Sequence, residues 1–154
     1  MEMRRARDDV VLRSLQRSLT DAVVHHGPHH RQMSSRARTI VVAYDDSDAS
    51  RRALDAAADL MGYGSTLSVV HVRRAGAPEG RTVDAARDHL LGRHVTARYL
   101  EPCGHPAKEV VEVARAVGAD LVVVGRRSAL KRVLGSVSAD VVRRAPCDVL
   151  VVGE

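Results

Sequence analysis

The stretch TIVVAY, residues Thr39–Tyr44, followed directly by DDSDASRRALDAAADLM, residues 45–61, decides the fold. The first six residues are an uninterrupted, mostly β-branched run, which is typical of a strand buried on both faces. The residues after it bring Leu54 and several alanines to one side at helical spacing, so a helix is expected over Ser47–Met61. A buried strand followed at once by an amphipathic helix is the repeating unit of α/β folds with a parallel sheet.

The same alternation continues to the end of the chain. Further strands are predicted at Thr66–Val72, His94–Leu100, Asp120–Val124 and Asp148–Val152. Further helices are predicted at Arg81–Leu91, 106–117 and Ser136–Arg144. Five strands alternating with four helices predict an α/β fold with a five-stranded parallel, doubly wound sheet of the flavodoxin-like or Rossmann-like kind. The expected strand order is 3-2-1-4-5, by analogy with such folds.

Residues 1–38 differ from the rest of the chain. An apolar stripe at spacings of three to four residues runs through Val11–Val23 and predicts a helix that ends near Val24. The residues that follow have no periodicity and are typical of a linker. We therefore expect a basic N-terminal extension over 1–38 and one domain over 39–154. If translation starts at Met33, the residues before it have no function to explain.

Composition excludes several classes of protein. The chain has 154 residues, which fits one domain, and its net charge of +5 comes mostly from the N-terminal extension, where eight Arg face four acidic residues. There is no Trp or Phe and there are only three Tyr, so stacking surfaces for nucleic acid are not expected. The apolar runs are far shorter than the roughly 20 residues of a membrane-spanning helix. Two cysteines without a CxxC spacing favour a reducing, cytoplasmic compartment.

Four histidines gather near the start of the chain, at His25, His26, His29 and His30. Neutral imidazoles bind transition metals. However, Gly27-Pro28 stands between the two pairs and prevents a shared helical face, and no carboxylate or cysteine is near in sequence. We therefore predict no metal site, although the role of the cluster stays open.

The turn after the first strand carries three carboxylates, at Asp45, Asp46 and Asp48. In an open parallel sheet, ligands bind outside the carboxyl ends of the strands, at the point where the strand order reverses. Asp45 should lie nearest that crevice, where its carboxylate can accept hydrogen bonds from ribose hydroxyls or hold Mg²⁺. The alternative is that Ser47 or Asp48 only caps the next helix and the acids complement its dipole.

The loop from Gly125 to Ser138 follows a buried strand and opens a helix. The first backbone N–H groups of a helix favour an anion, and four cationic residues precede them, at Arg126, Arg127, Lys131 and Arg132. Phosphate binding is the natural chemical interpretation. The alternative is a solvated loop whose glycines only turn the chain.

Several motifs occur in a particular order: TIVVAYDDSDASRRAL at 39–54, VVHV at 69–72, Gly104-His105-Pro106, DLVVVG at 120–125 and LGSVSADVVRRAPCDVLVV at 134–152. In this order and spacing, residues Thr39–Val152 resemble the universal stress protein family. The resemblance implies an α/β domain involved in stress survival that is usually dimeric through its last strand. Here that strand is Val149–Val152, which we expect to be an edge where two copies pair.

One branch of that family binds ATP and another does not. In the binding branch, Asp45 would meet the ribose and the backbone at Val72 would meet adenine. The phosphates would lie on the glycine-rich loop, which here comprises Gly125, Ser128, Gly135, Ser136, Val137 and Ser138. Mg²⁺ would accompany the nucleotide.

The sequence departs from that pattern at three points. Ser128 stands where the family has a second Gly, and only the six residues Ala129–Leu134 separate it from Gly135, where the family has nine. Asp46 stands where a Gly is common. Two functions therefore stay open, a stress-response module that binds ATP or another adenine nucleotide and a dimeric scaffold that acts through protein partners without a nucleotide.

A Mg²⁺-dependent phosphotransfer enzyme is a third hypothesis, because acid clusters also follow the first strand in such enzymes. It needs a further acidic or lysine partner at a later strand end. The third, fourth and fifth predicted strands end instead in Leu100-Glu101, Gly125 and Gly153-Glu154. No general base is evident, so any ATPase activity should be weak.

Overall fold

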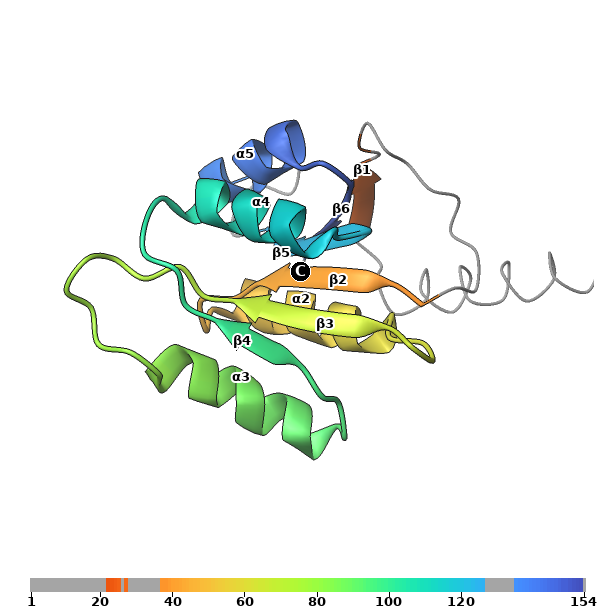
Figure 1. Ribbon diagram of the computed structural model, residues 1–154, viewed down its shortest axis with the longest axis horizontal. Coiled ribbons are helices and arrows are strands. Elements are labelled where there is room, and N and C mark those ends of the chain that lie inside the picture. The colour runs from red at the N-terminus through yellow and green to blue at the C-terminus, as the bar shows by residue number, and fades with distance from the viewer. Residues whose placement is uncertain (1–21, 26, 28–36, 127–134, 154) are drawn as a thin grey trace, which may run out of the picture.

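The computed structural model describes residues 22–25, 27, 37–126 and 135–153. Within them one sheet is covered by two helices on each face (Figure 1). The strands are β1 Ala22–His25, β2 Thr39–Ala43, β3 Thr66–Val70, β4 Arg98–Leu100, β5 Leu121–Gly125 and β6 Asp148–Val152. The helices are α2 Asp48–Asp59, α3 Arg81–Gly92, α4 Pro106–Val117 and α5 Ser136–Arg144.

The strand order is β1-β6-β5-β2-β3-β4. The five strands from β2 to β6 are parallel and confirm the predicted α/β sheet and its 3-2-1-4-5 order. β2 lies between β3 and β5, so the order reverses at β2. The crevice for a ligand is therefore expected at the carboxyl ends of β2 and β5.

The sheet has a sixth strand that the sequence analysis missed. β1 pairs antiparallel with β6, from Ala22 opposite Val152 to His25 opposite Val149. The prediction of a helix reaching Val24 is wrong at these residues, and Val149–Val152 is not an open edge in this structure. The valines of β1 continued the apolar stripe before them, and their partner strand lies at the other end of the chain, where no local pattern can indicate it.

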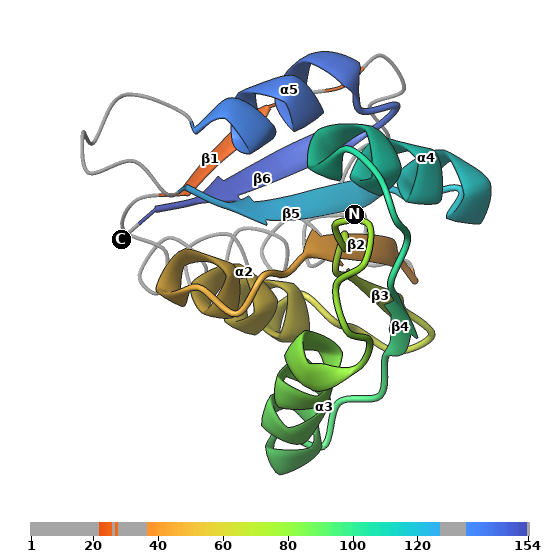
Figure 2. The same ribbon diagram turned by 90° about the vertical axis from the view of Figure 1, so that its left-hand side faces the viewer.

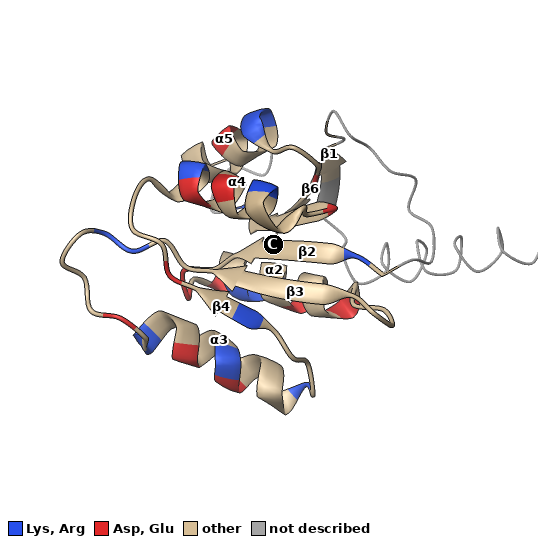
Figure 3. Cartoon of the chain, in the orientation of Figure 1, with Lys and Arg blue, Asp and Glu red and all other residues tan. Residues whose placement is uncertain are grey.

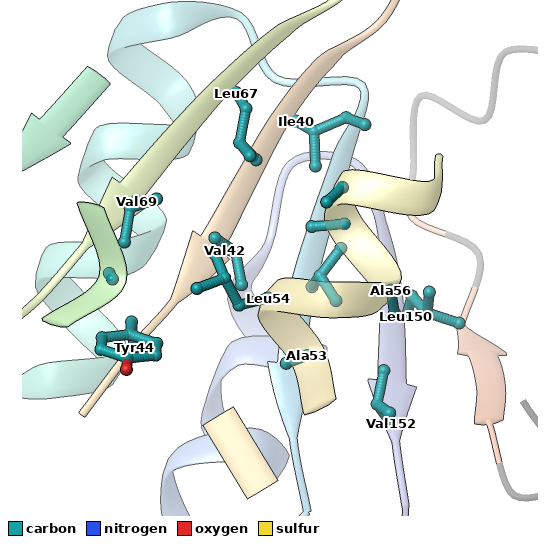
Figure 4. Packing of buried hydrophobic residues seen from close by; sticks show 14 of the residues in the cluster. Ile40, Val42, Tyr44, Ala53, Leu54, Ala56, Leu67, Val69, Leu150 and Val152 are labelled. Carbon is teal, nitrogen blue, oxygen red and sulfur yellow. The ribbon is translucent and has the colours of Figure 1, made fainter. Parts of the chain in front are cut away.

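The two faces of the sheet bury separate cores because successive side chains of a strand point to opposite faces. Ile40 and Val42 pack with Leu54 of α2, as Figure 4 shows. Val41 belongs to the other core, under α4 and α5. Figure 2 shows the helical layers on either side of the sheet. Figure 3 shows that the charged residues of the described chain lie mostly in the helices and loops.

Local signals set the ends of two helices. Ser47 caps α2, since its hydroxyl accepts a hydrogen bond from the Ser50 N–H at 3.2 Å. α4 starts with Pro106, a residue that the first turn tolerates. It ends at Gly118, whose φ of 62° is left-handed and therefore suits glycine.

The strand predicted over His94–Leu100 is shorter in the structure, where β4 covers only Arg98–Leu100. The preceding residues complete the turn that leaves α3. His94 has a φ of 56°, and its N–H donates to the Leu91 carbonyl at 3.0 Å. The apolar alternation alone could not distinguish this turn from a strand.

Candidate functional site

The structure brings three of the predicted site residues to the same edge of the sheet. Asp45 follows β2, Val72 follows β3 and Gly125 ends β5. The register sets Val42 opposite Val123, so the chain after β2 and the chain after β5 leave the sheet side by side. This is the crevice that the strand order defines.

Asp45 organises the turn that leads into α2. Its Oδ1 accepts hydrogen bonds from the Ser47 N–H at 3.1 Å and from the Ser47 hydroxyl at 2.5 Å. The Asp45 N–H donates to the Ser50 hydroxyl at 3.2 Å, and the residue itself is exposed. The capping interpretation is therefore correct for Ser47, while Asp45 holds the turn and stays accessible from solvent.

Asp46 adopts a conformation that usually belongs to glycine. Its φ is 64°, a left-handed value that Asp tolerates better than most residues. Its Oδ1 accepts from the Tyr44 hydroxyl at 2.8 Å and from the Arg51 Nε and Nη2 at 3.1 and 2.9 Å. The chain thus places an aspartate in a backbone conformation that favours glycine, and it pairs the carboxylate with a cation.

These contacts shift the ionisation of both partners. The Tyr44 hydroxyl and then the Arg51 guanidinium lower the pKa of Asp46 by hydrogen bonding to its carboxylate. Burial, followed by the hydrogen bond to Asp46, raises the pKa of Tyr44 to about 12. Asp46 is therefore ionised and Tyr44 is neutral at physiological pH. Tyr44 and Arg51 lie in the motif at 39–54, but their contacts with Asp46 could not be predicted because they depend on side-chain geometry.

Gly125 is fixed by packing against α2. A Cβ on Gly125 would lie 2.4 Å from the carbonyl oxygen of Ala49 and 2.9 Å from the Ser50 nitrogen. No side chain fits there, so the first turn of α2 rests directly on the end of β5. The glycine that the sequence analysis assigned to phosphate thus has a structural role, which joins the Asp45 turn to the β5 end.

The N-terminus of α5 follows Gly135, which has no side chain to cap the helix. The first helical hydrogen bond runs from the Ala139 N–H to the Gly135 carbonyl at 2.9 Å. The N–H groups of Ser136, Val137 and Ser138 precede that bond, as the first N–H groups of any helix do. The Ser138 hydroxyl donates to the Gly125 carbonyl at 2.9 Å and so ties this helix end to β5.

The cationic loop is only partly described. Arg126 is 8% exposed, and its N–H donates to the Val152 carbonyl at 2.8 Å. At this residue the loop is therefore buried, unlike the solvated loop that was the alternative interpretation. Other predicted residues of the loop lie outside the described part of the chain, namely Ser128, Arg127, Lys131 and Arg132.

The backbone at Val72 faces the crevice. The N–H groups of its two neighbours, His71 and Arg73, donate to Leu100 and Pro102 on the β4 side, both at 2.9 Å. Because alternate residues of an extended strand point to opposite sides, the N–H and carbonyl of Val72 point past the end of β2. β2 has already turned away there, after Tyr44.

His71 links the ends of β2 and β3. Its Nδ1 lies 3.0 Å from the Tyr44 carbonyl. A carbonyl only accepts hydrogen bonds, so Nδ1 carries the proton and donates it. His71 is half-buried and lies just after β3, so this hydrogen bond joins the two strand ends beyond the last pair of the sheet.

The described residues contain no cluster of three or more His, Cys, Asp or Glu arranged to hold a metal ion. Of the N-terminal histidines they include only His25. No helix within the described ranges is long and apolar enough to cross a membrane. The groups that the described residues offer at this edge are the Asp45 carboxylate, backbone groups at Val72 and the first N–H groups of α5.

An open, mostly parallel sheet covered by two helices on each face defines the doubly wound class of α/β domains. Within that class, the sequence profile of the universal stress protein family matches residues 36–102 and 83–153. The chain belongs to this family.

Individual relatives agree with this assignment. Universal stress protein Rv1636 of Mycobacterium tuberculosis is 32% identical in an alignment of 139 positions that covers 75% of this chain and 95% of that protein. A universal stress protein solved in complex with cAMP is 32% identical, with a TM-score of 0.60 over 76% of this chain and 97% of that one. A family protein from Arabidopsis thaliana, solved with AMP bound, has a TM-score of 0.62 over 76% of this chain and 92% of that one. At 18% identity it supports the fold alone.

Proposed function

We propose that this universal stress protein binds an adenine nucleotide in the crevice between the Asp45 turn and the start of α5. Asp45 would accept hydrogen bonds from the ribose, and the Val72 backbone would contact adenine. The phosphates would lie on the N–H groups of Ser136, Val137 and Ser138. The observation that carries the proposal is the position of Gly125, which lies against Ala49 of α2 on one side and accepts a hydrogen bond from the Ser138 hydroxyl of α5 on the other.

The start of α5 fits an anion. The helix has nine residues, no acidic residue in its first turn and two arginines, Arg143 and Arg144, in its last turn. Its dipole and its first N–H groups therefore favour a negative group at Ser136. With glycine at position 135, a phosphate oxygen can approach the backbone without meeting a side chain.

The extra carboxylate does not oppose this use of the crevice. Asp46 is held by Tyr44 and by both donors of Arg51, so a neighbouring cation offsets its charge. Electrostatic repulsion between Asp46 and a phosphate is correspondingly reduced. This addresses one of the three departures from the family pattern.

The relative in complex with cAMP, 32% identical to this chain, supports an adenine nucleotide as the ligand class. We propose ATP with Mg²⁺ as one candidate and a nucleotide with a single phosphate as the other. The short segment between Ser128 and Gly135 offers fewer backbone groups for a triphosphate chain. A weaker affinity for ATP than for AMP or cAMP is therefore expected.

Isothermal titration calorimetry of the purified full chain with MgATP, AMP and cAMP tests the proposal. An ultraviolet spectrum comes first, because a protein with three Tyr and no Trp would show co-purified adenine clearly. We expect a dissociation constant of about 100 μM or tighter for at least one of them. GTP serves as the control for the base. If the protein is purified free of nucleotide and all three titrations are silent, the proposal fails and the nucleotide-free scaffold is the better description.

A further inference from the structure

The outer edge of β6 is covered by the chain's own N-terminal residues. β6 is buried along its whole length, from Asp148 to Val152, and β1 lies along it. We call residues 22–25 and 27 the edge segment. Without it, β6 would be the last strand of the sheet, with unpaired backbone groups that template pairing with another chain.

The edge segment takes the place that a second copy would occupy. A two-fold axis perpendicular to a strand brings the same strand of a second copy alongside it in the antiparallel direction. β1 runs antiparallel to β6. Its sequence, AVVH, is rich in β-branched residues, as is VLVV at 149–152. The edge segment therefore imitates the β6 strand of a symmetric partner in both direction and composition.

The segment is also seated by contacts that a simple strand ladder would not provide. Gly27 donates its N–H to Asp148 Oδ1 at 2.9 Å, and Asp148 is 6% exposed. A Cβ on Gly27 would lie 2.3 Å from the Cys147 carbonyl oxygen and 2.9 Å from the Cys147 Cα. The Gly27 backbone thus rests on the bend before β6, where no side chain fits.

We propose that the edge segment competes with a second copy of this chain for the outer edge of β6. A strand tethered to its own domain acts at an effective concentration on the order of millimolar. A second copy at micromolar concentration competes poorly against it. Dimerisation through β6 therefore requires release of the edge segment. The inference is independent of nucleotide binding.

The substitution Gly27→Ala tests the proposal in the full chain. It adds only the Cβ that collides with Cys147, and it leaves the β6 edge itself unchanged. Gly92→Ala is the matched control, because a Cβ at the end of α3 meets nothing within 4 Å. Sedimentation equilibrium over roughly a hundredfold range of protein concentration measures the dimer dissociation constant of each. We expect Gly27→Ala to dimerise at least about tenfold more tightly than both the wild type and Gly92→Ala.

Hydrogen exchange of the wild type gives a second measurement that needs no variant. If the edge segment belongs to the same chain, protection of the β1 and β6 amides is the same at low and high protein concentration. Protection of β1 that grows with concentration would mean that the strand comes from a second copy, and it would overturn the proposal. Equal dimer constants for the wild type and folded Gly27→Ala would overturn it as well. If Gly27→Ala does not fold, the exchange experiment decides.

Discussion

The two sides of the candidate nucleotide crevice are built by different means. The Asp45 turn is held by side chains close in sequence, since Asp45, Ser47 and Ser50 bond to one another. The opposite side depends on missing side chains, at Gly125 and Gly135, and on backbone groups. One side of the site therefore depends on local hydrogen bonds, and the other side depends on positions that lack a Cβ. The two halves should fail in different ways when they are mutated.

The largest effect is expected for Gly125→Val. The Cβ alone would lie 2.4 Å from the Ala49 oxygen, so α2 must move away from β5. Overpacking of this kind costs about 3 kcal/mol of unfolding free energy or more. Urea denaturation followed by circular dichroism measures it. Gly135→Val is the matched control, because a Cβ there meets nothing within 4 Å. Equal stability of the two variants would contradict the packing role of Gly125.

Gly135→Val should act on the ligand and leave the fold intact. The added branches would stand over the first N–H groups of α5, where a phosphate must approach. We expect the nucleotide affinity to fall by about a hundredfold, or roughly 2.7 kcal/mol, with an unchanged urea midpoint. Calorimetry and denaturation on the same preparation separate the two effects. Unchanged affinity in a protein whose wild type binds nucleotide would refute the phosphate position.

Asp45→Asn tests the side of the crevice that is held by local hydrogen bonds. Asparagine keeps the Oδ1 acceptor that holds the Ser47 N–H and removes the charge that would strengthen a bond to ribose. Because hydrogen bonds to a charged group are stronger than neutral ones, we expect a loss of about fivefold to tenfold in affinity. Asp48→Asn, in the exposed first turn of α2, is the control. If both variants bind equally well, Asp45 has no ribose contact.

The smallest effect concerns Tyr44, which closes the inner side of the acidic turn. Its folded pKa is raised from 10.0 to about 12, first by burial and then by the hydrogen bond to Asp46. The folded state therefore favours the neutral phenol. This contribution is fully present below pH 10 and is lost as the pH rises towards 12.

Unfolding free energy measured in urea between neutral pH and pH 11 should accordingly fall less steeply in Tyr44→Phe than in the wild type. Tyr63→Phe is the control, since the Tyr63 ring is fully exposed. Identical slopes for the wild type and Tyr44→Phe would contradict the raised pKa.

Much of this architecture could be predicted from the sequence because its determinants are local. The β-branched runs locate the five parallel strands, and Gly118 ends α4 as expected. The positions of Asp45 and Gly125 beside each other follow from the strand order alone. The contacts that these two residues make could not be predicted from the strand order, because the Gly125 contact with Ala49 joins segments far apart in the chain.

The features that the sequence analysis missed all depend on non-local or side-chain geometry. β1 is four residues long and its partner is β6, so its valines looked like the end of a helical stripe. Arg51 neutralises Asp46, which lies five residues before it, and this pairing depends on side-chain geometry. Arg126 was one of four cations of the predicted loop, and its burial beside the end of β6 could not be predicted because Val152 lies far along the chain.

The pairing of β1 with β6 also sets an order of events during synthesis. β1 cannot pair until β6, the last of the described strands, has left the ribosome. The strands between them can already have begun to pair, because contacts between segments far apart in the chain form more slowly than closer ones. A newly made chain therefore passes through a stage in which β1 does not yet cover the outer edge of β6. On a polysome, the β6 edges of two neighbouring chains would lie close together at this stage.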